Sequence, residues 1–149
     1  MEKFNFEIKN NNLTIGEDEF DLNEILIAEI IKLKEHNSDY AIKLTFKDDF
    51  VNKWIILEDY CTNNKAEIIY YFNNLATAIN KNNPKFTLYN YKYFLNLENI
   101  DEINIQKNLL SKSTIIKSGN FKYVLSYNKN EYNSLQDHFS NLNNQNKGI

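Results

Sequence analysis

Three side chains of this sequence could carry nucleophilic or metal chemistry: Cys61, His36 and His138. A thiolate and an imidazole form a nucleophile–base pair when the fold brings them together, whatever their separation along the chain. Each of the three is alone in its segment, so the ligand spacings of a metal site are missing. Nothing near Cys61 would activate its thiol, and both histidines have polar neighbours. The sequence therefore predicts no catalytic residue, no metal site and no cofactor.

Carboxylates are the second group of side chains with chemical potential. Adjacent pairs at Asp48-Asp49, Glu58-Asp59 and Asp101-Glu102 could act as general acids or metal ligands, although their positions fit polar loops better. The densest acidic run lies between residues 17 and 24 and contains Glu17, Asp18, Glu19, Asp21 and Glu24. Like charges this close repel one another. The run is therefore either a solvated loop or a surface that attracts a basic partner.

Tyr89, Tyr91 and Tyr93 recur at every second position of a segment, 86–97, that is expected to be one strand. Side chains at this spacing share a face of a strand. If the face is exposed, three tyrosines make a firm amphipathic contact surface for a partner. If a helix covers the face, they belong to the core, because tyrosine is also common in buried strands. Both interpretations stay open.

Composition narrows the class of protein. The 149 residues are most simply one domain, and 42% hydrophobic with 14% aromatic residues exclude intrinsic disorder. The chain contains 27 asparagines, and every basic residue is lysine, which is typical of AT-rich coding DNA. Without arginine there is no bidentate fork for phosphate or guanine, and three isolated glycines make no phosphate-binding loop. We expect no nucleic-acid partner.

The distribution of charge and of apolar residues suggests a location and a partner. Residues 1–60 hold 14 acidic and 7 basic side chains, a net charge of −7, whereas residues 61–149 hold 6 and 10, a net charge of +4. No signal peptide and no membrane span is expected, because no apolar run approaches the ~20 residues that a span needs. A single cysteine suits a reducing compartment. We therefore expect a cytoplasmic protein.

An apolar pattern occurs twice in the chain. In each half a short apolar strand leads into an amphipathic helix, and the helices match at a constant spacing of 67 residues: Ile68, Phe72 and Leu75 against Leu135, Phe139 and Leu142. Earlier in each half, at a spacing of 75 residues, Leu22-x-x-Ile25 matches Leu97-x-x-Ile100. We predict an internal repeat of residues 10–83 and 84–142, followed by a frayed tail over 143–149.

Local patterns predict strands and two helices. Period-two alternation and β-branched content predict strands at 3–9, 13–16, 25–34, 42–47, 53–57, 86–97, 114–117 and 121–125. A bulge is expected near Glu29, and the segment 101–110 is ambiguous. Helices are expected at 63–80, capped by Thr62 or Asn63, and at 131–142. The predicted fold is a single α+β domain, 1–149: an antiparallel sheet built from two similar strand-meander-plus-helix units, with the helices packed on the sheet.

Three classes of function fit this outline. Each unit is similar in outline to pleckstrin-homology-like modules, which implies an adaptor or lipid-binding role that needs a basic pocket; Lys85, Lys92, Lys117 and Lys122 are scattered candidates. An enzyme with no recognisable motif is another class. The preferred class is a small protein-binding inhibitor, such as a bacterial immunity protein that neutralises a toxin by occluding its active site. Its partner would be another protein with a basic domain, bound by the acidic run or by the three tyrosines.

Overall fold

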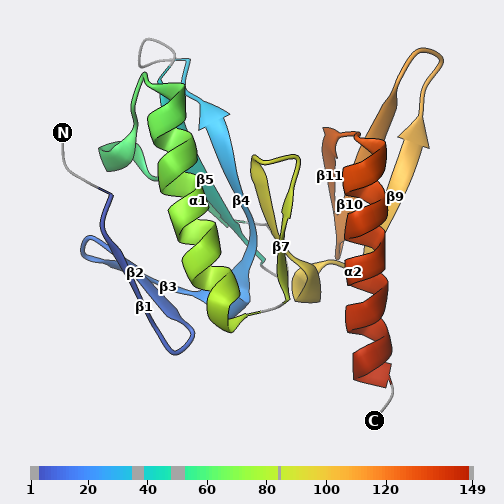
Figure 1. The fold of residues 1–149 in the computed structure, drawn as a ribbon, viewed down its shortest axis with the longest axis horizontal. Coiled ribbons are helices and arrows are strands. Elements are labelled where there is room, and N and C mark those ends of the chain that lie inside the picture. Colours follow the sequence, from blue (N-terminus) through green and yellow to red (C-terminus); the bar gives the residue numbers. More distant parts are fainter. Residues whose placement is uncertain (1–3, 35–38, 48–52, 84, 148–149) are drawn as a thin grey trace.

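The computed structural model describes residues 4–34, 39–47, 53–83 and 85–147. Within them the chain forms antiparallel sheets and two long helices, so the predicted α+β class is confirmed. In Figure 1 the N-terminal sheet and the first helix lie on the left, a short hairpin lies in the middle, and the C-terminal sheet and helix lie on the right.

Three sheets account for the described strands. The first has the order β1-β2-β3 and consists of β1 (Phe6–Lys9), β2 (Asn12–Ile15) and β3 (Asp18–Asp21). The second has the order β6-β5-β4-β8-β7 and consists of β4 (Ile25–Lys32), β5 (Tyr40–Phe46), β6 (Lys53–Ile56), β7 (Phe86–Tyr89) and β8 (Tyr93–Asn96). The third has the order β11-β10-β9 and consists of β9 (Glu102–Lys107), β10 (Lys112–Ser118) and β11 (Phe121–Ser126).

The helices are α1 (Lys65–Asn82) and α2 (Lys129–Lys147), and single 3-10 turns form η1 (Leu22–Glu24), η2 (Glu58–Tyr60) and η3 (Leu97–Asn99). Helix α1 begins after Asn64, whose side-chain oxygen accepts hydrogen bonds from the backbone N–H groups of Ala66 (3.0 Å) and Glu67 (3.3 Å). The cap is therefore Asn64 and not Thr62 or Asn63, and it satisfies two amides that the helix leaves free.

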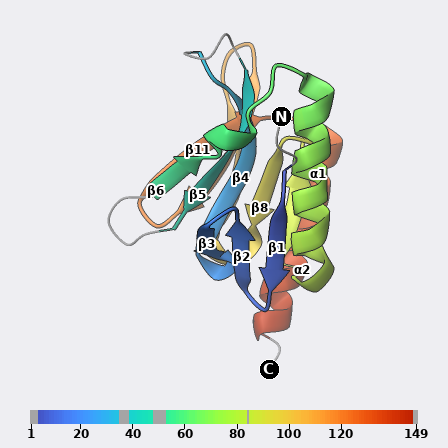
Figure 2. The ribbon, with the colours of Figure 1, turned by 90° about the vertical axis from the view of Figure 1, so that its left-hand side faces the viewer.

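Helix α1 and the first two sheets enclose one core. The helix buries the stripe expected from its sequence, Ile68, Phe72, Leu75 and Ile79. Figure 2 shows β1 lying beside α1, with β2 and β3 following outward. Leu13 and Leu22 enter the core from the N-terminal segment, and Ala28, Leu44 and Phe94 enter it from the five-stranded sheet. The N-terminal sheet therefore covers the flank of α1 and does not extend the larger sheet.

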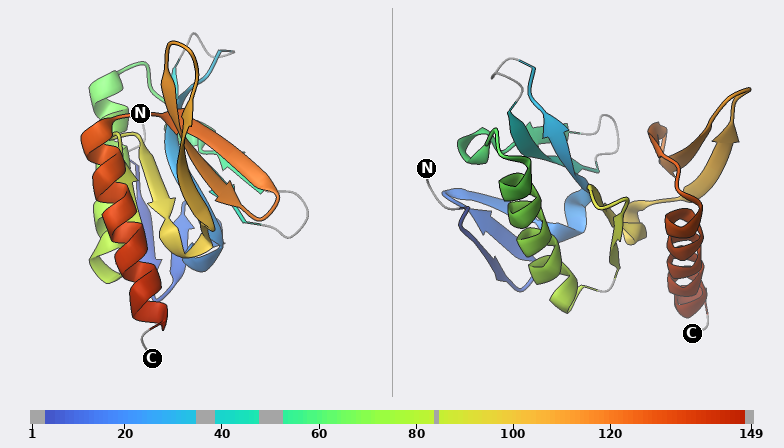
Figure 3. Two further views of the ribbon diagram at one scale, coloured as in Figure 1. Left: turned by 90° about the vertical axis from the view of Figure 1, so that its right-hand side faces the viewer. Right: turned by 45° about the horizontal axis from the view of Figure 1, so that its top comes forward.

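A second core lies between α2, the third sheet and the opposite face of the five-stranded sheet. Leu135 and Phe139 of α2 pack here with Ile103 and Ile116 of the third sheet. From the five-stranded sheet, Ile27 and Leu95 reach the same core. Figure 3 shows α2 lying along the β7–β8 hairpin on this side. The strands β4 and β8 thus supply both cores, because neighbouring residues of a strand point to opposite faces.

Several local predictions were wrong. The segment 86–97 is not one strand but the hairpin β7–β8, because the chain turns at Asn90 and Tyr91. The bulge in β4 lies between Ile25 and Ile27 and not near Glu29. The ambiguous segment contains β9, and helix α2 continues beyond Leu142 to Lys147, through most of the tail that was expected to fray.

We expect Phe72→Ala and Phe139→Ala each to lower the free energy of unfolding by about 3–5 kcal/mol, as buried aromatic truncations do. Phe72 is 1% exposed in the first core and Phe139 is 8% exposed in the second. Urea denaturation measures the loss. Tyr70→Ala is the matched control, because Tyr70 lies on α1 but is largely exposed. A loss below about 1 kcal/mol for either phenylalanine would mean that its helix does not face the core as described.

Candidate functional site

The acidic run forms ordered structure on the surface of the N-terminal half. Residues 18–21 are strand β3, and the next three residues are η1. The Asp21 carboxylate accepts a hydrogen bond from the Asn23 backbone N–H (2.9 Å) and so caps η1. The other acidic side chains of the run are exposed or half-buried beside β6 and η2. The run is therefore a structured surface, which holds its charges in fixed places.

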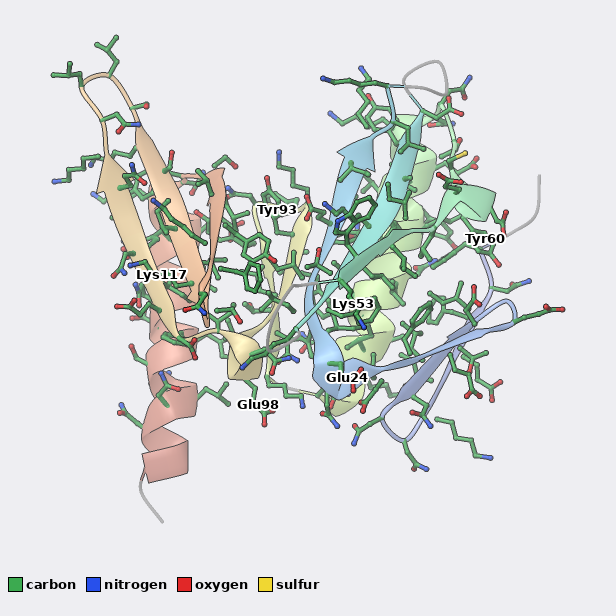
Figure 4. All side chains as sticks on the ribbon, turned by 180° about the vertical axis from the view of Figure 1, so that it is seen from behind. Glu24, Lys53, Tyr60, Tyr93, Glu98 and Lys117 are labelled. Atoms are coloured by element: carbon green, nitrogen blue, oxygen red, sulfur yellow. The ribbon has the colours of Figure 1, made fainter. Side chains whose placement is uncertain are left out.

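Two adjoining clefts contain the whole run. The first, of about 620 Å³, has Glu17 and Asp18 on one wall and Glu58 and Asp59 on the opposite wall. The second, of about 450 Å³, is lined by Glu19, Asp21 and Glu24. Both share Phe20 and Ile55 as an apolar floor. In Figure 4 Tyr60, which also lines the first cleft, lies on the side of the N-terminal sheet, and Glu24 and Lys53 lie together near the start of β4.

The first cleft is the more negative of the two. Within the described part of the chain, no ion pair involves its four carboxylates; the pairs found there are Lys85–Glu98 (2.9 Å) and Lys117–Glu102 (3.6 Å). The second cleft also contains Lys47 and Lys53, which reduce its negative potential. The first cleft is therefore the stronger candidate for attracting a cationic group, and its apolar floor can bury the stem of a long basic side chain.

The three tyrosines do not form a common face. Tyr89 is fully buried, and its hydroxyl hydrogen-bonds with Thr114 Oγ1 (2.6 Å) and donates to the Ser126 carbonyl (3.0 Å). Tyr91 lies in the β7–β8 turn and is 74% exposed. Tyr93 is half-buried on β8, opposite Tyr89. Neither acidic cleft is lined by any of them, so the structure does not join the two predicted contact surfaces.

A basic cleft that no sequence pattern indicated lies beside the Tyr91 turn. It measures about 460 Å³ and is lined by Lys32 at the end of β4, Lys65 at the start of α1 and Lys92 next to β8. Of the four lysines considered as a basic pocket, this cleft contains one: Lys85 and Lys117 pair with glutamates, and Lys122 is exposed on β11. The three lysines come from separate elements, so no spacing along the chain could have revealed the cleft.

Glu29 lies on β4 close to this cleft and is half-buried. Desolvation by burial raises the pKa of its carboxyl, and the positive charges of Lys43 and Lys92 oppose that rise. Lys43 faces Glu29 across the sheet and also lies over the Trp54 ring, 4.9 Å from its centroid. Glu29 therefore bears part of the electrostatic cost of this face of the sheet.

The thiol and imidazole groups form no catalytic pair in the described structure. Cys61 Sγ lies 3.9 Å from Asp39 Oδ2, and burial together with this negative neighbour raises the pKa of the Cys61 thiol. A raised thiol pKa disfavours the reactive thiolate. His138 lies on α2, away from the segment before α1 that carries Cys61 (Figure 1), and His36 and the pair Asp48-Asp49 lie outside the described residues.

The remaining acidic pair has a structural role. Asp101 accepts a hydrogen bond from the Gly119 backbone N–H (2.6 Å) and fixes the β10–β11 turn, and Glu102 pairs with Lys117. Among the described residues, no three histidine, cysteine or acidic side chains gather as a metal would require. No described helix is long and apolar enough to cross a membrane.

Comparison with known proteins assigns no family to this chain. No protein-family model matches it, and neither a curated protein nor a solved structure is significantly similar to it. Its function therefore has to be argued from the clefts themselves.

We expect Tyr91→Gly to raise the free energy of unfolding by about 1 kcal/mol, because a left-handed backbone costs an L-residue roughly that much. Tyr91 adopts φ +60° and is mostly exposed, so little burial is lost. Chemical denaturation measures the change. Tyr70→Gly is the control: it removes a similarly exposed tyrosine from a helical position and should destabilise by a similar amount. If both substitutions destabilise equally, the turn is not strained.

We expect Glu29→Gln to raise the melting temperature at neutral pH. Because the carboxyl pKa is raised on folding, its favourable contribution is complete below the ordinary carboxyl pKa and is lost as the pH rises through the raised value. The neutral amide avoids that loss, so the gain should disappear near about pH 4. Thermal melts at the two pH values test this, with Glu7→Gln on exposed β1 as the control. A lower melting temperature at neutral pH would mean that Lys43 and Lys92 outweigh the cost of burial.

Proposed function

We propose that this protein is a small protein-binding inhibitor, of the kind represented by immunity proteins, that occludes the active site of a basic toxin domain. The observation that carries the proposal is the first acidic cleft, where Glu17 and Asp18 face Glu58 and Asp59 across an apolar floor. Basic side chains that bind nucleic acid in a toxin would find here carboxylates in place of phosphates. This comparison with inhibitors of nucleases is an analogy of chemistry, not of family.

The form of the cleft supports a protein partner over a metal ion or a small substrate. The four carboxylates stand on two separate walls and no described cluster suits a metal. Phe20 and Ile55 extend the floor into the second cleft, so the complete surface is elongated and mixes apolar with charged groups. Protein interfaces commonly combine a desolvated apolar centre with a charged border that speeds association.

We also propose that the two halves of the chain are diverged copies of one unit. After β1, both halves run through a hairpin, a 3-10 turn, three strands and a helix. Both 3-10 turns are capped by the side chain before them, Asp21 in one half and Asn96 in the other, 75 residues apart. The first residues in the two hairpin turns with φ near +60° and the same spacing are Gly16 and Tyr91. An experimental structure in which residues 10–56 and 84–126 do not superpose would reject the duplication.

The proposed copies differ where the inhibitor surface lies. Position 94 of β8 is a buried phenylalanine that joins β8 to β4, and the position 75 residues earlier is Glu19, on β3. A carboxylate cannot replace a buried ring without a large desolvation cost. Strand β3 accordingly stays in its own sheet, where its charges line the clefts. In this proposal, divergence of one hairpin converted a packing element into a binding surface.

We expect charge reversal in the first cleft, Glu17→Lys with Asp18→Lys, to slow association with the basic partner by about tenfold or more while changing dissociation less, because distributed charge acts mainly on the encounter. Stopped-flow mixing with the toxin-like protein encoded beside this gene measures both rates at low and high salt. The effect should shrink at high salt as the screening length falls.

Glu7→Lys with Asp137→Lys is the matched control, because it changes the net charge equally at exposed positions of β1 and α2. If control and cleft variants slow association alike, only net charge matters and the cleft is not the interface. If neither variant changes binding, the inhibitor uses another surface.

A further inference from the structure

One edge of the molecule concentrates lysines at the ends of its elements. In Figure 1 the start of α1, the β7–β8 turn, the start of α2 and the tip of the β9–β10 hairpin all point to the top. Lys32, Lys65 and Lys92 lie at this edge around the basic cleft, and Lys107 and Lys112 flank the hairpin tip. We call these five lysines and the surfaces between them the basic edge.

The basic cleft has the composition of an anion site. Three ammonium groups from three elements line it, and no carboxylate is among the described residues that do so. Lys32 is further oriented by Tyr40, with Nζ 5.7 Å from the ring centroid. Ile30 and Ile69 form an apolar floor. Three like charges around one concave surface repel one another, and a bound anion would remove that repulsion.

The turn beside the cleft is held in an uncommon conformation. Asn90 and Tyr91 have φ of +52° and +60°, a region that residues other than glycine rarely adopt. The Asn90 amide fixes the turn by donating to the carbonyl oxygen (2.8 Å) and the hydroxyl (2.9 Å) of Ser126. This conformation presents the exposed Tyr91 ring at the rim of the cleft. Strained residues of this kind concentrate at ligand-binding sites.

The β9–β10 hairpin ends in the most exposed apolar residues described. Leu109 and Leu110 are 103% and 99% exposed, and the Asn108 N–H donates to the Ser111 carbonyl (2.8 Å) to close the loop beneath them. Lys107 and Lys112 are direct cross-strand neighbours, an unfavourable pair of like charges. Two leucines at a tip with a collar of lysines match the boundary between the acyl chains and the phosphates of an anionic lipid layer.

We propose that the basic edge docks on an anionic lipid surface: the basic cleft takes the phosphate of a headgroup, and Leu109 and Leu110 enter the acyl boundary. A soluble phosphate would explain the cleft but would leave two fully exposed leucines without a role. The acidic clefts fit this orientation, because Tyr60 lies on the opposite side of the molecule from the β9–β10 tip (Figure 4). The docking is independent of the inhibitor proposal, and the two can fail separately.

The test is cosedimentation of the full chain with phosphatidylcholine vesicles, with and without phosphatidylserine. We expect binding only when phosphatidylserine is present, and weaker binding at high salt. Replacing Lys32, Lys65 and Lys92 by glutamine should weaken it by roughly fivefold per lysine. The matched control replaces Lys9, Lys81 and Lys122, three exposed lysines that line none of these clefts. Equal losses in both triple variants, or equal binding to both kinds of vesicle, would overturn the proposal.

A second pair of measurements separates a lipid from a soluble ligand. Leu109→Ser with Leu110→Ser should reduce vesicle binding severalfold and leave unchanged the chemical shifts that inorganic phosphate induces at the basic cleft. Because both leucines are fully exposed, the double variant should keep the melting temperature of the parent protein. If inorganic phosphate binds while the leucine changes leave vesicle binding intact, the lipid assignment is wrong. If neither vesicles nor phosphate bind, the basic edge is not an anion site.

Discussion

The pairing of β4 with β8 is the interaction on which the rest of the molecule depends. In this antiparallel ladder Ala28 lies opposite Phe94 and Ile27 lies opposite Leu95. The first pair packs in the α1 core and the second in the α2 core. A slip of one residue would exchange the two sets, so each core fixes the register for the other. Asn96 and Asn99 add to this by donating to the Ile25 carbonyl, each at 2.9 Å.

Both candidate surfaces follow from this one ladder. Because β8 takes the edge of β4, the turn after β7 brings Lys92 to the end of β4 and to the start of α1, where Lys32 and Lys65 lie. Because that edge is occupied, β3 remains in the separate N-terminal sheet, and its carboxylates face β6 and η2 across the acidic clefts. The charge asymmetry of the sequence thus becomes two surfaces of opposite sign on different sides of the fold.

The sequence predicted what local periodicity determines. The α+β class, the helices and their buried residues Phe72 and Phe139 follow from spacing alone. The Tyr89–Tyr93 segment misled because a turn without glycine interrupts the alternation, and asparagine before tyrosine is a weak turn signal. The acidic run was visible in sequence, but Glu58 and Asp59 join it only through tertiary packing. The basic cleft was invisible for the same reason, since no period relates its lysines.

The shared ladder also determines when the chain can fold during synthesis. Phe86 and Phe94 belong to the core that α1 closes, so the N-terminal half leaves the ribosome with that core incomplete. It must wait for the β7–β8 hairpin, which a hypothetical early termination after α1 would never supply. Such long-range strand pairing slows folding and leaves a sheet edge exposed in the meantime. Whatever the origin of its two halves, this chain matures as one cooperative unit, and neither half is a separable module.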